Sequence, residues 1–254
     1  MNVPSLPSPS AQIRVGTAGW KLPAPVRERF GGDGSHLERY AGRFSCVEIN
    51  SSFYRPHRPS TYARWAASVP DDFRFALKIP KEITHKRRLI DAIEPLESFL
   101  AESAMLGEKR SVLLVQLPPS FAYDADLVGA FLAEFRTRYT GLIACEPRHA
   151  TWFTPEADDL LRRFEVARVA ADPALSPEAS LPGGWDGFTY YRLHGSPRTY
   201  YSSYDDAALR ETAERLCAAP KPAWCIFDNT AMDEAAANAL DLTELLAGSR
   251  TRGA

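Results

Sequence analysis

Short apolar segments recur at regular intervals along this chain, and they constrain its fold more than any other feature of the sequence. Each has an apolar core of four to eight residues and ends in a polar or glycine-containing cluster. Such runs are typical of parallel strands that are buried on both faces. We therefore predict eight strands, at 13–20, 45–54, 73–80, 111–119, 142–152, 166–173, 188–195 and 223–230.

Segments with helical spacing separate these predicted strands. A capping box from Ser35 to Glu38 opens the first helix. Further amphipathic helices are predicted at 59–68, 96–106, 124–139, 155–164, 205–219 and 235–246, several with Pro, Asp or Ser near the start. The stretch 174–187 is rich in Pro and Gly, and we expect an irregular crossover there instead of a helix.

The alternation of strands and helices predicts an α/β fold, and the count of eight favours a single (β/α)8 TIM barrel over a doubly wound open sheet. About 30 residues per unit is the size of a βα repeat, and no Gly-rich dinucleotide fingerprint follows the first strand. We expect a disordered tail at 1–12, the barrel domain at 13–248 and a flexible C-terminus at 249–254.

The charge and cysteine content narrow the possible partners. The 30 basic and 32 acidic residues give a net charge of −2, so no global field attracts nucleic acid or an anionic membrane. The four cysteines lack the spacing of a zinc module. With no signal peptide and no transmembrane segment in the sequence, we expect a cytoplasmic protein with reduced thiols and no membrane partner.

Polar residues collect where the predicted strands end, which is where barrel enzymes place their active sites. Strand alternation puts Glu48, Glu146, Arg192 and His194 on the inward face, because their neighbours in the strand are apolar. Buried charge is costly unless it is paired. We therefore expect an ion pair between Arg192 and Glu48 or Glu146, which is a purely structural alternative to a catalytic role.

Seven motifs in the chain match a known family in order. They are Val15-Gly-Thr-Ala-Gly-Trp20, Val47-Glu-Ile-Asn-Ser-Ser-Phe-Tyr54, Ala76-Leu-Lys-Ile-Pro80 followed by Ile83-Thr-His85, Leu117-Pro-Pro-Ser-Phe121, Glu146-Pro-Arg-His-Ala-Thr-Trp152, Tyr191-Arg-Leu-His-Gly195 and Phe227-Asp-Asn-Thr230. From about residue 13 to residue 245 the chain resembles the YecE-like family, domain of unknown function 72.

The resemblance implies a TIM barrel similar in architecture to sugar isomerases and to endonuclease IV, and it implies no particular reaction. Two positions depart from the family pattern. Pro147 stands where the family usually has Phe, and Asp228 stands where it usually has Asn. Asp228 therefore adds a carboxylate to the predicted mouth of the barrel.

An anion pocket is the first functional hypothesis, because cations and potential backbone donors lie near the strand ends, and aromatic side chains that could stack a sugar follow them. The expected ligand is a small anionic or sugar-like molecule, possibly phosphorylated. Its expected contacts are Trp20, Asn50, Tyr54, Lys78, Gln116, Arg148, His149, Arg192, Gly195, Tyr201, Asp228, Asn229 and Thr230.

General acid–base chemistry would fall to Glu48, Glu146 and His194. We expect Glu146 to stay ionised beside Arg148, and His194 to be neutral because of Arg192. The enzyme would then be isomerase-like or phosphodiesterase-like. No cofactor is predicted, although a divalent metal held by Glu146, Asp172, His194 and Asp228 remains an alternative.

Two other classes of function stay open at this stage. One is a protein that binds or processes nucleic acid, for which Lys81, Lys86, Arg87 and Arg88 would supply the basic surface. The other is a regulatory, non-catalytic barrel that binds a ligand. The sequence does not choose an oligomeric state.

Overall fold

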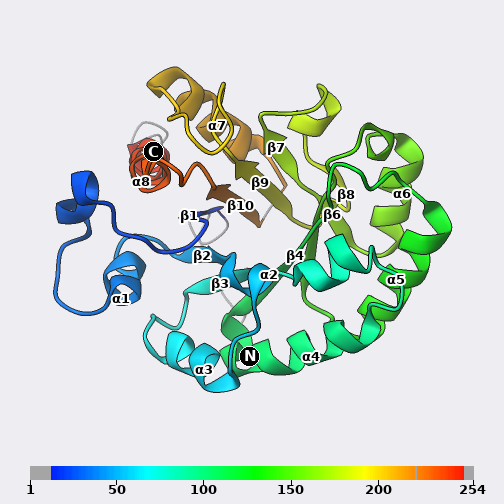
Figure 1. Ribbon diagram of the computed structural model, residues 1–254. Helices are drawn as coiled ribbons and strands as arrows, with labels where there is room; N and C mark the ends of the chain where they lie inside the picture. Colours follow the sequence, from blue (N-terminus) through cyan, green and yellow to red (C-terminus); the bar gives the residue numbers. More distant parts are fainter. Residues whose placement is uncertain (1–12, 221, 249–254) are drawn as a thin grey trace, which may run out of the picture.

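Parallel strands form a closed ring in the computed structural model, which describes residues 13–220 and 222–248. The ring runs in chain order through β1 (Ile13–Thr17), β2 (Cys46–Ile49), β3 (Arg74–Lys78), β4 (Arg110–Gln116), β5 (Leu142–Glu146), β6 (Val166–Arg168), β7 (Ala170–Asp172), β9 (Thr189–Leu193) and β10 (Ala223–Phe227). The helices surround the strands (Figure 1). The predicted TIM barrel is therefore confirmed.

Two junctions join the two hydrogen-bonded sheets into one barrel. β6 pairs with β5 and β7 pairs with β9, so one predicted strand passes from one sheet to the other at Val169. The amide of Val169 donates to the carbonyl of Cys145 at 2.8 Å, which keeps this crossing in line. At the other junction Ala18 bridges to Glu48, and β1 pairs with β10 along its length.

The buried side chains separate into two layers, as the strand alternation predicts. The outer layer fills the space between strands and helices and includes Val47, Ile49 and Leu193. The inner layer fills the lower part of the barrel with Cys46, Ala76, Val112, Leu114, Ala144, Ala167, Val169, Phe188, Tyr190, Trp224 and Ile226.

The helices begin largely where the sequence places a capping residue. They are α1 (His36–Ala41), α2 (Ser51–Tyr54), α3 (Pro59–Ala67), α4 (Ile93–Ser103), α5 (Ala125–Arg138), α6 (Pro155–Arg163), α7 (Asp206–Ala218) and α8 (Glu234–Gly248). The predicted capping box is present: Ser35 Oγ accepts from the amide of Glu38, and Glu38 Oε2 accepts from the amide of Ser35. Asp124, Thr154 and Asp205 cap α5, α6 and α7: the side chain of each accepts a hydrogen bond from the amide three residues further on.

The predicted strands were too long at their C-terminal ends. Residues 51–54 form helix α2, and Ala150–Trp152 forms a short 3-10 helix. The apolar residues Phe53 and Trp152 in these segments are buried, as strand residues would be, so the linear pattern does not separate these segments from a strand. The irregular crossover is confirmed: 174–187 holds only the 3-10 turn Glu178–Ser180 and the two-residue strand β8 (Gly183–Gly184).

Arg168 fastens this crossover to the barrel. Its guanidinium contacts both oxygens of Asp158, at 2.7 and 3.1 Å, and also donates to the carbonyls of Glu178 and Leu181. The expected tails at 1–12 and 249–254 lie outside the described residues. Within the described ranges, no helix has the length and apolarity needed to cross a membrane.

Gly16 marks the closest approach of β1 to β2, and this yields a first prediction. A Cβ at Gly16 would lie 2.3 Å from the carbonyl oxygen of Cys46. We expect Gly16→Ala to lower the free energy of unfolding by about 2 kcal/mol or more, because backbone would have to move. Urea unfolding followed by circular dichroism measures this.

Gly129→Ala is the matched control. Gly129 lies inside α5, where an added Cβ would be 3.7 Å from Leu160, an ordinary contact. This change should be neutral or stabilising by up to about 1 kcal/mol, since Ala is the better helix former. Equal stability of Gly16→Ala and the wild type would show that the barrel does not close tightly at this junction.

Candidate functional site

A buried network of charged side chains fills the C-terminal end of the barrel, and Arg192 is at its centre. The Arg192 guanidinium is fully buried and contacts three carboxylates from three parts of the ring. It binds Glu48 through Nη2 and Nε at 2.7 and 3.1 Å, Asp228 through Nη2 at 2.9 Å, and Glu146 through Nη1. The expected ion pair of Arg192 is thus present with Glu48 and with Glu146.

Glu48 occupies the deepest position in this network. Its oxygens accept from the Tyr190 hydroxyl at 2.8 Å and from Arg192, and the side chain has no exposed surface. A carboxylate with both oxygens occupied and no access to solvent is poorly placed to exchange a proton with a ligand. The geometry therefore favours the structural alternative for this residue.

His194 bridges two of the carboxylates. Its Nε2 lies 3.0 Å from Glu146 Oε1 and its Nδ1 lies 3.1 Å from Asp228 Oδ2. Burial lowers the pKa of His194. The attraction of Glu146 and the hydrogen bonds to Asp228 and Glu146 together raise it by more than burial lowers it, so the pKa is above its ordinary value. The sequence reasoning expected Arg192 to disfavour the charged form of His194, and the direction of the pKa shift is the opposite, because that reasoning counted neither carboxylate.

Glu146 stays ionised, as expected from the sequence. Burial raises its pKa, but Arg192, His194 and Arg148 together hold that pKa well below the ordinary value. Asp228 is lowered in the same direction: burial opposes ionisation, while Arg192 and His194 favour it. Carboxylates with such low pKa values are weak proton acceptors, so they hold the cations in place more readily than they act as general bases.

Arg148 and Tyr200 cover the network on the side of the solvent. Arg148 contacts Glu146 Oε1 through Nε and Nη2, at 3.0 and 2.9 Å, and donates to the Tyr200 hydroxyl at 3.1 Å. The Tyr200 ring packs edge-on against His194. The ligand contact predicted at Tyr201 lies elsewhere on this loop, because the Tyr201 ring packs against Arg198 at 3.9 Å.

Lys78 ends β3 and lies on the same inner face, but it is outside the ion-pair network. Its side chain is 9% exposed, and its Nζ lies 4.0 Å from the centre of the Phe53 ring. Among the described residues, no carboxylate lies within 4.0 Å of this nitrogen. Burial, followed by repulsion from Arg192, lowers the pKa of Lys78 to about 8.

His85 belongs to this site but was not among the predicted site residues. It lies in a single turn of π-helix, Glu82–Lys86. Its ring packs edge-on against the Phe53 ring, the same ring that Lys78 Nζ contacts. Burial lowers its pKa, and Lys78 and Arg148 lower it further, so the imidazole is neutral at pH 7. The sequence signal was Ile83-Thr-His85, which follows the third predicted strand and belongs to the motifs that resemble the family.

The remaining predicted contacts divide into two groups. Asn50 and Gln116 lie at the mouth: the Asn50 amide faces Asp228 at 3.5 Å, and Gln116 is buried beside Glu146 in the strand register. The other contacts serve local structure or lie on the rim. They are Trp20 against Trp65, the exposed Tyr54, His149 as the cap of a 3-10 turn, Gly195 donating to the Tyr204 hydroxyl, and Asn229 and Thr230 before α8.

The four residues of the metal alternative do not converge. Glu146, His194 and Asp228 lie together, but Asp172 pairs with Leu193, whose side chain belongs to the outer layer. The Asp172 carboxylate instead accepts from the Tyr204 hydroxyl at 2.6 Å. Across 13–220 and 222–248, no group of three or more His, Cys, Asp and Glu side chains has the arrangement of a metal site.

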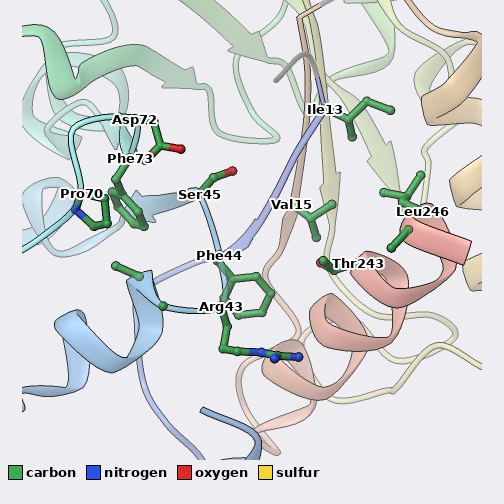
Figure 2. Close-up of a pocket in the computed structure, with 13 residues that line it drawn as sticks. Ile13, Val15, Arg43, Phe44, Ser45, Pro70, Asp72, Phe73, Thr243 and Leu246 are labelled. Atoms are coloured by element: carbon green, nitrogen blue, oxygen red, sulfur yellow. The ribbon is translucent and has the colours of Figure 1, made fainter. Parts of the chain in front are cut away.

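A separate cavity of about 330 Å³ lies at the other end of the barrel. It opens between the start of β1, the turn after α1 and the end of α8 (Figure 2). Val15, Phe44 and Leu246 give it an apolar wall. Because this is the N-terminal end of the strands, where barrels carry stability instead of chemistry, the charged mouth is the better candidate site.

The fold and this charged mouth define a (β/α)8 barrel protein. The family model described as "Protein of unknown function DUF72" matches residues 14–253, so the chain belongs to that family. The UPF0759 protein YunF of Bacillus subtilis is 25% identical over 92% of this chain and 94% of its own length. The UPF0759 protein YecE of Escherichia coli is 33% identical, but that match spans only 43% of this chain and 39% of the relative.

Solved structures share the fold. A DUF72 family protein from Enterococcus faecalis has a TM-score of 0.78 at 21% identity, covering 92% of this chain and 95% of its own. One from Thermotoga maritima has a TM-score of 0.75 at 24% identity, covering 92% and 99%. The 3-keto-D-glucoside 4-epimerase YcjR of E. coli reaches 0.51 at 12% identity, covering 92% and 98%, a likeness of fold alone.

The network predicts a large cost for removing its central cation. Arg192→Met leaves three buried carboxylates without their shared partner, so we expect the free energy of unfolding at pH 7 to fall by about 3–5 kcal/mol. The deficit should shrink as the pH is lowered toward about 4, because the uncompensated carboxylates then take up protons. Urea unfolding at several pH values measures both effects.

Arg215→Met is the control for this change. Arg215 is exposed and pairs with Glu211 one turn away in α7, and such pairs contribute about 0.5 kcal/mol or less. If Arg192→Met were as mild as Arg215→Met, the network would not be holding the barrel together.

Replacing Lys78 is expected to raise the free energy of unfolding, whereas replacing Arg192 lowers it. In the folded protein its pKa is about 8, below that of an unfolded lysine, so the charged form destabilises the fold fully below pH 8 and this cost is relieved as the pH rises toward about 10.4. Lys78→Met should therefore be more stable than the wild type at pH 7. The difference should narrow by about 2 kcal/mol between about pH 7 and 9.5.

Urea unfolding of both proteins at each pH tests this, and Lys86→Met is the control because Lys86 is exposed and pairs with Glu82. A stability difference between the wild type and Lys78→Met that does not change with pH would contradict a lowered pKa at Lys78.

Proposed function

We propose that this protein is an enzyme that acts on a small anionic or sugar-like ligand bound at the mouth of the barrel. One observation carries the proposal: Lys78 is a buried cation with no carboxylate partner among the described residues. The three carboxylates of the mouth, Glu48, Glu146 and Asp228, are each engaged by Arg192, and Glu146 also by the half-buried Arg148. A bound anion would supply the charge that Lys78 lacks.

The rim of the site suits a hydroxylated ligand. Tyr200 presents a ring and a hydroxyl beside Arg148, and the Asn50 side chain has a buried Oδ1 with no hydrogen-bond partner among the described residues. Buried polar atoms are normally satisfied. A ligand hydroxyl that donates to Asn50 Oδ1 would satisfy it, and the Tyr200 ring would stack against a sugar face.

Proton transfer in this proposal falls to Lys78 and His85 instead of the buried acids. The pKa of Lys78 is about 8, close to neutral, which is the range in which a group both accepts and releases protons efficiently. Glu146 and His194 then orient Arg148 and Arg192 and fix the charge of the pocket.

The nucleic-acid alternative has less support from the surface charges. In the predicted basic stretch, Lys86 and Arg87 both pair with Glu82, and Arg87 also pairs with Glu94. Phosphate binding would have to break these pairs. A small ligand in the mouth requires no such rearrangement.

The binding step can be tested by calorimetry with inorganic phosphate, a set of sugar phosphates and small carboxylates. We expect saturable binding of at least one anion. Lys78→Met should weaken that binding by about 10-fold or more, because a charge-assisted hydrogen bond contributes about 1.5–3 kcal/mol.

Lys86→Met should bind as the wild type does, since Lys86 lies outside the mouth and pairs with Glu82. Equal affinity of Lys78→Met and the wild type, or the absence of saturable binding for every anion in the set, would contradict the proposal.

A further inference from the structure

Lys78 is held rigidly at the base of the mouth. It is the last residue of β3, in register with Leu114 of the inner layer. The Ser52 hydroxyl donates to its carbonyl at 2.7 Å, and the next amide, that of Ile79, donates to the carbonyl of Leu114 at 3.0 Å. These hydrogen bonds fix the backbone at Lys78, so its side chain starts from a well-defined position.

Lys78 is the one buried lysine among the described residues. Lys21 contacts Asp233, Lys86 contacts Glu82, and Lys81 lies 6.0 Å from the ring of the exposed Tyr54. Lys109 donates to the carbonyls of Ala66 and Val69. For Lys78 Nζ the contact that the structure shows is the face of Phe53, which is itself 8% exposed. Phe53 thus shields the amine from water.

The charge state of the amine matches this environment. Burial and the nearby Arg192 lower the pKa of Lys78 to about 8. At about pH 7.5 the neutral fraction of such a lysine is roughly a hundredfold larger than that of an ordinary lysine. A desolvated lysine next to another cation is the environment that activates an amine as a nucleophile.

We infer that Lys78 is a covalent attachment point: its amine condenses with the carbonyl group of a small aldehyde or ketone held in the barrel mouth. The neutral nitrogen attacks the carbonyl carbon, and the carbonyl oxygen takes up the proton that the nitrogen loses. The hydroxyl of the resulting carbinolamine leaves as water together with the second proton of the nitrogen, and a carbon–nitrogen double bond to Lys78 forms. No oxidant or further reactant is required.

The charges around Lys78 allow either form of this product. The neutral imine removes the buried positive charge that burial and Arg192 disfavour, and the protonated imine carries the same charge as the ammonium, which Glu146, Glu48 and Asp228 attract. His85 packs against the same Phe53 ring and is neutral at pH 7. It is therefore available to accept the proton that Lys78 must release before it attacks.

The ligand class follows from combining this chemistry with the anion site. The inference deepens the proposed function and rests on it for one feature only, the anionic group of the ligand. The expected ligand is a small carbonyl compound that bears a carboxylate or a phosphate, with its carbonyl at Lys78 and its anionic group beside Arg148.

Reductive trapping tests the inference. The full-length protein is incubated at about pH 7.5 with glyoxylate, glyceraldehyde 3-phosphate or uncharged glycolaldehyde in the presence of sodium cyanoborohydride, and adducts are mapped by peptide mass spectrometry. We expect adducts on Lys78 to form at least about tenfold faster than on Lys86, because the neutral fraction of Lys78 is larger. Lys78→Met, checked for folding by circular dichroism, should lose the fast adduct, and Lys86→Met should keep it.

The probes separate the two proposals. Faster labelling of Lys78 by the carboxylate and phosphate probes than by glycolaldehyde supports both the imine and the anion site. Equal labelling by all three supports the imine and removes the anionic ligand. If calorimetry shows that the anionic probes bind while Lys78 is labelled no faster than Lys86, the imine is overturned and the binding proposal stands.

Discussion

The structure depends on the coordination of one buried guanidinium. Arg192 donates hydrogen bonds to carboxylates on β2, on β5 and after β10, which lie in widely separated parts of the ring. A barrel of eight strands has an interior that side chains must fill completely. The lower part is filled with apolar residues and the upper part with this network. Arg192 therefore replaces an apolar layer and cross-links the barrel at the end where its loops meet.

The charge of that network dictates the state of its neighbours. Three carboxylates around one guanidinium carry an excess of negative charge, and this excess raises the pKa of His194 and holds Arg148 against Glu146. The acids that strand alternation marks for catalysis are thus committed to cations. The proposed chemistry therefore falls to groups at the margin of the network, among which Lys78 is a buried cation.

The sequence predicted the features that depend on periodicity. Alternation with a period of two places Glu48, Arg192 and His194 inside the barrel, and the number of apolar runs gives eight strands. It also predicted the ion pair of Arg192 with Glu48 or Glu146, but it did not predict the contacts that His194 makes across the ring. The raised pKa of His194 depends on Glu146 and Asp228, which are 48 and 34 residues away.

Local backbone geometry was equally hidden from the pattern. Asp172 follows the crossing at Val169 and lies in register with Leu193 of the outer layer, so it does not join Glu146, His194 and Asp228. Tyr200, which covers the site, has a φ of 70°. This left-handed conformation is uncommon for tyrosine, so the residue type does not predict it. His85 lies in a π-turn, which has no periodic signature of its own.

Lys78 is where stability and function separate most clearly. An unbranched apolar side chain such as Met would fit against Phe53 and avoid the cost of burying a charge. The position instead holds an amine that is 9% exposed and has a lowered pKa, with no ion pair in the described chain to offset that cost. Residues that break a local physical rule without compensation are expected at functional sites. In the proposed complex, a ligand that neutralises the amine or bonds to it would offset this cost, so the unpaired charge of Lys78 links the lower stability of the free protein to the proposed binding.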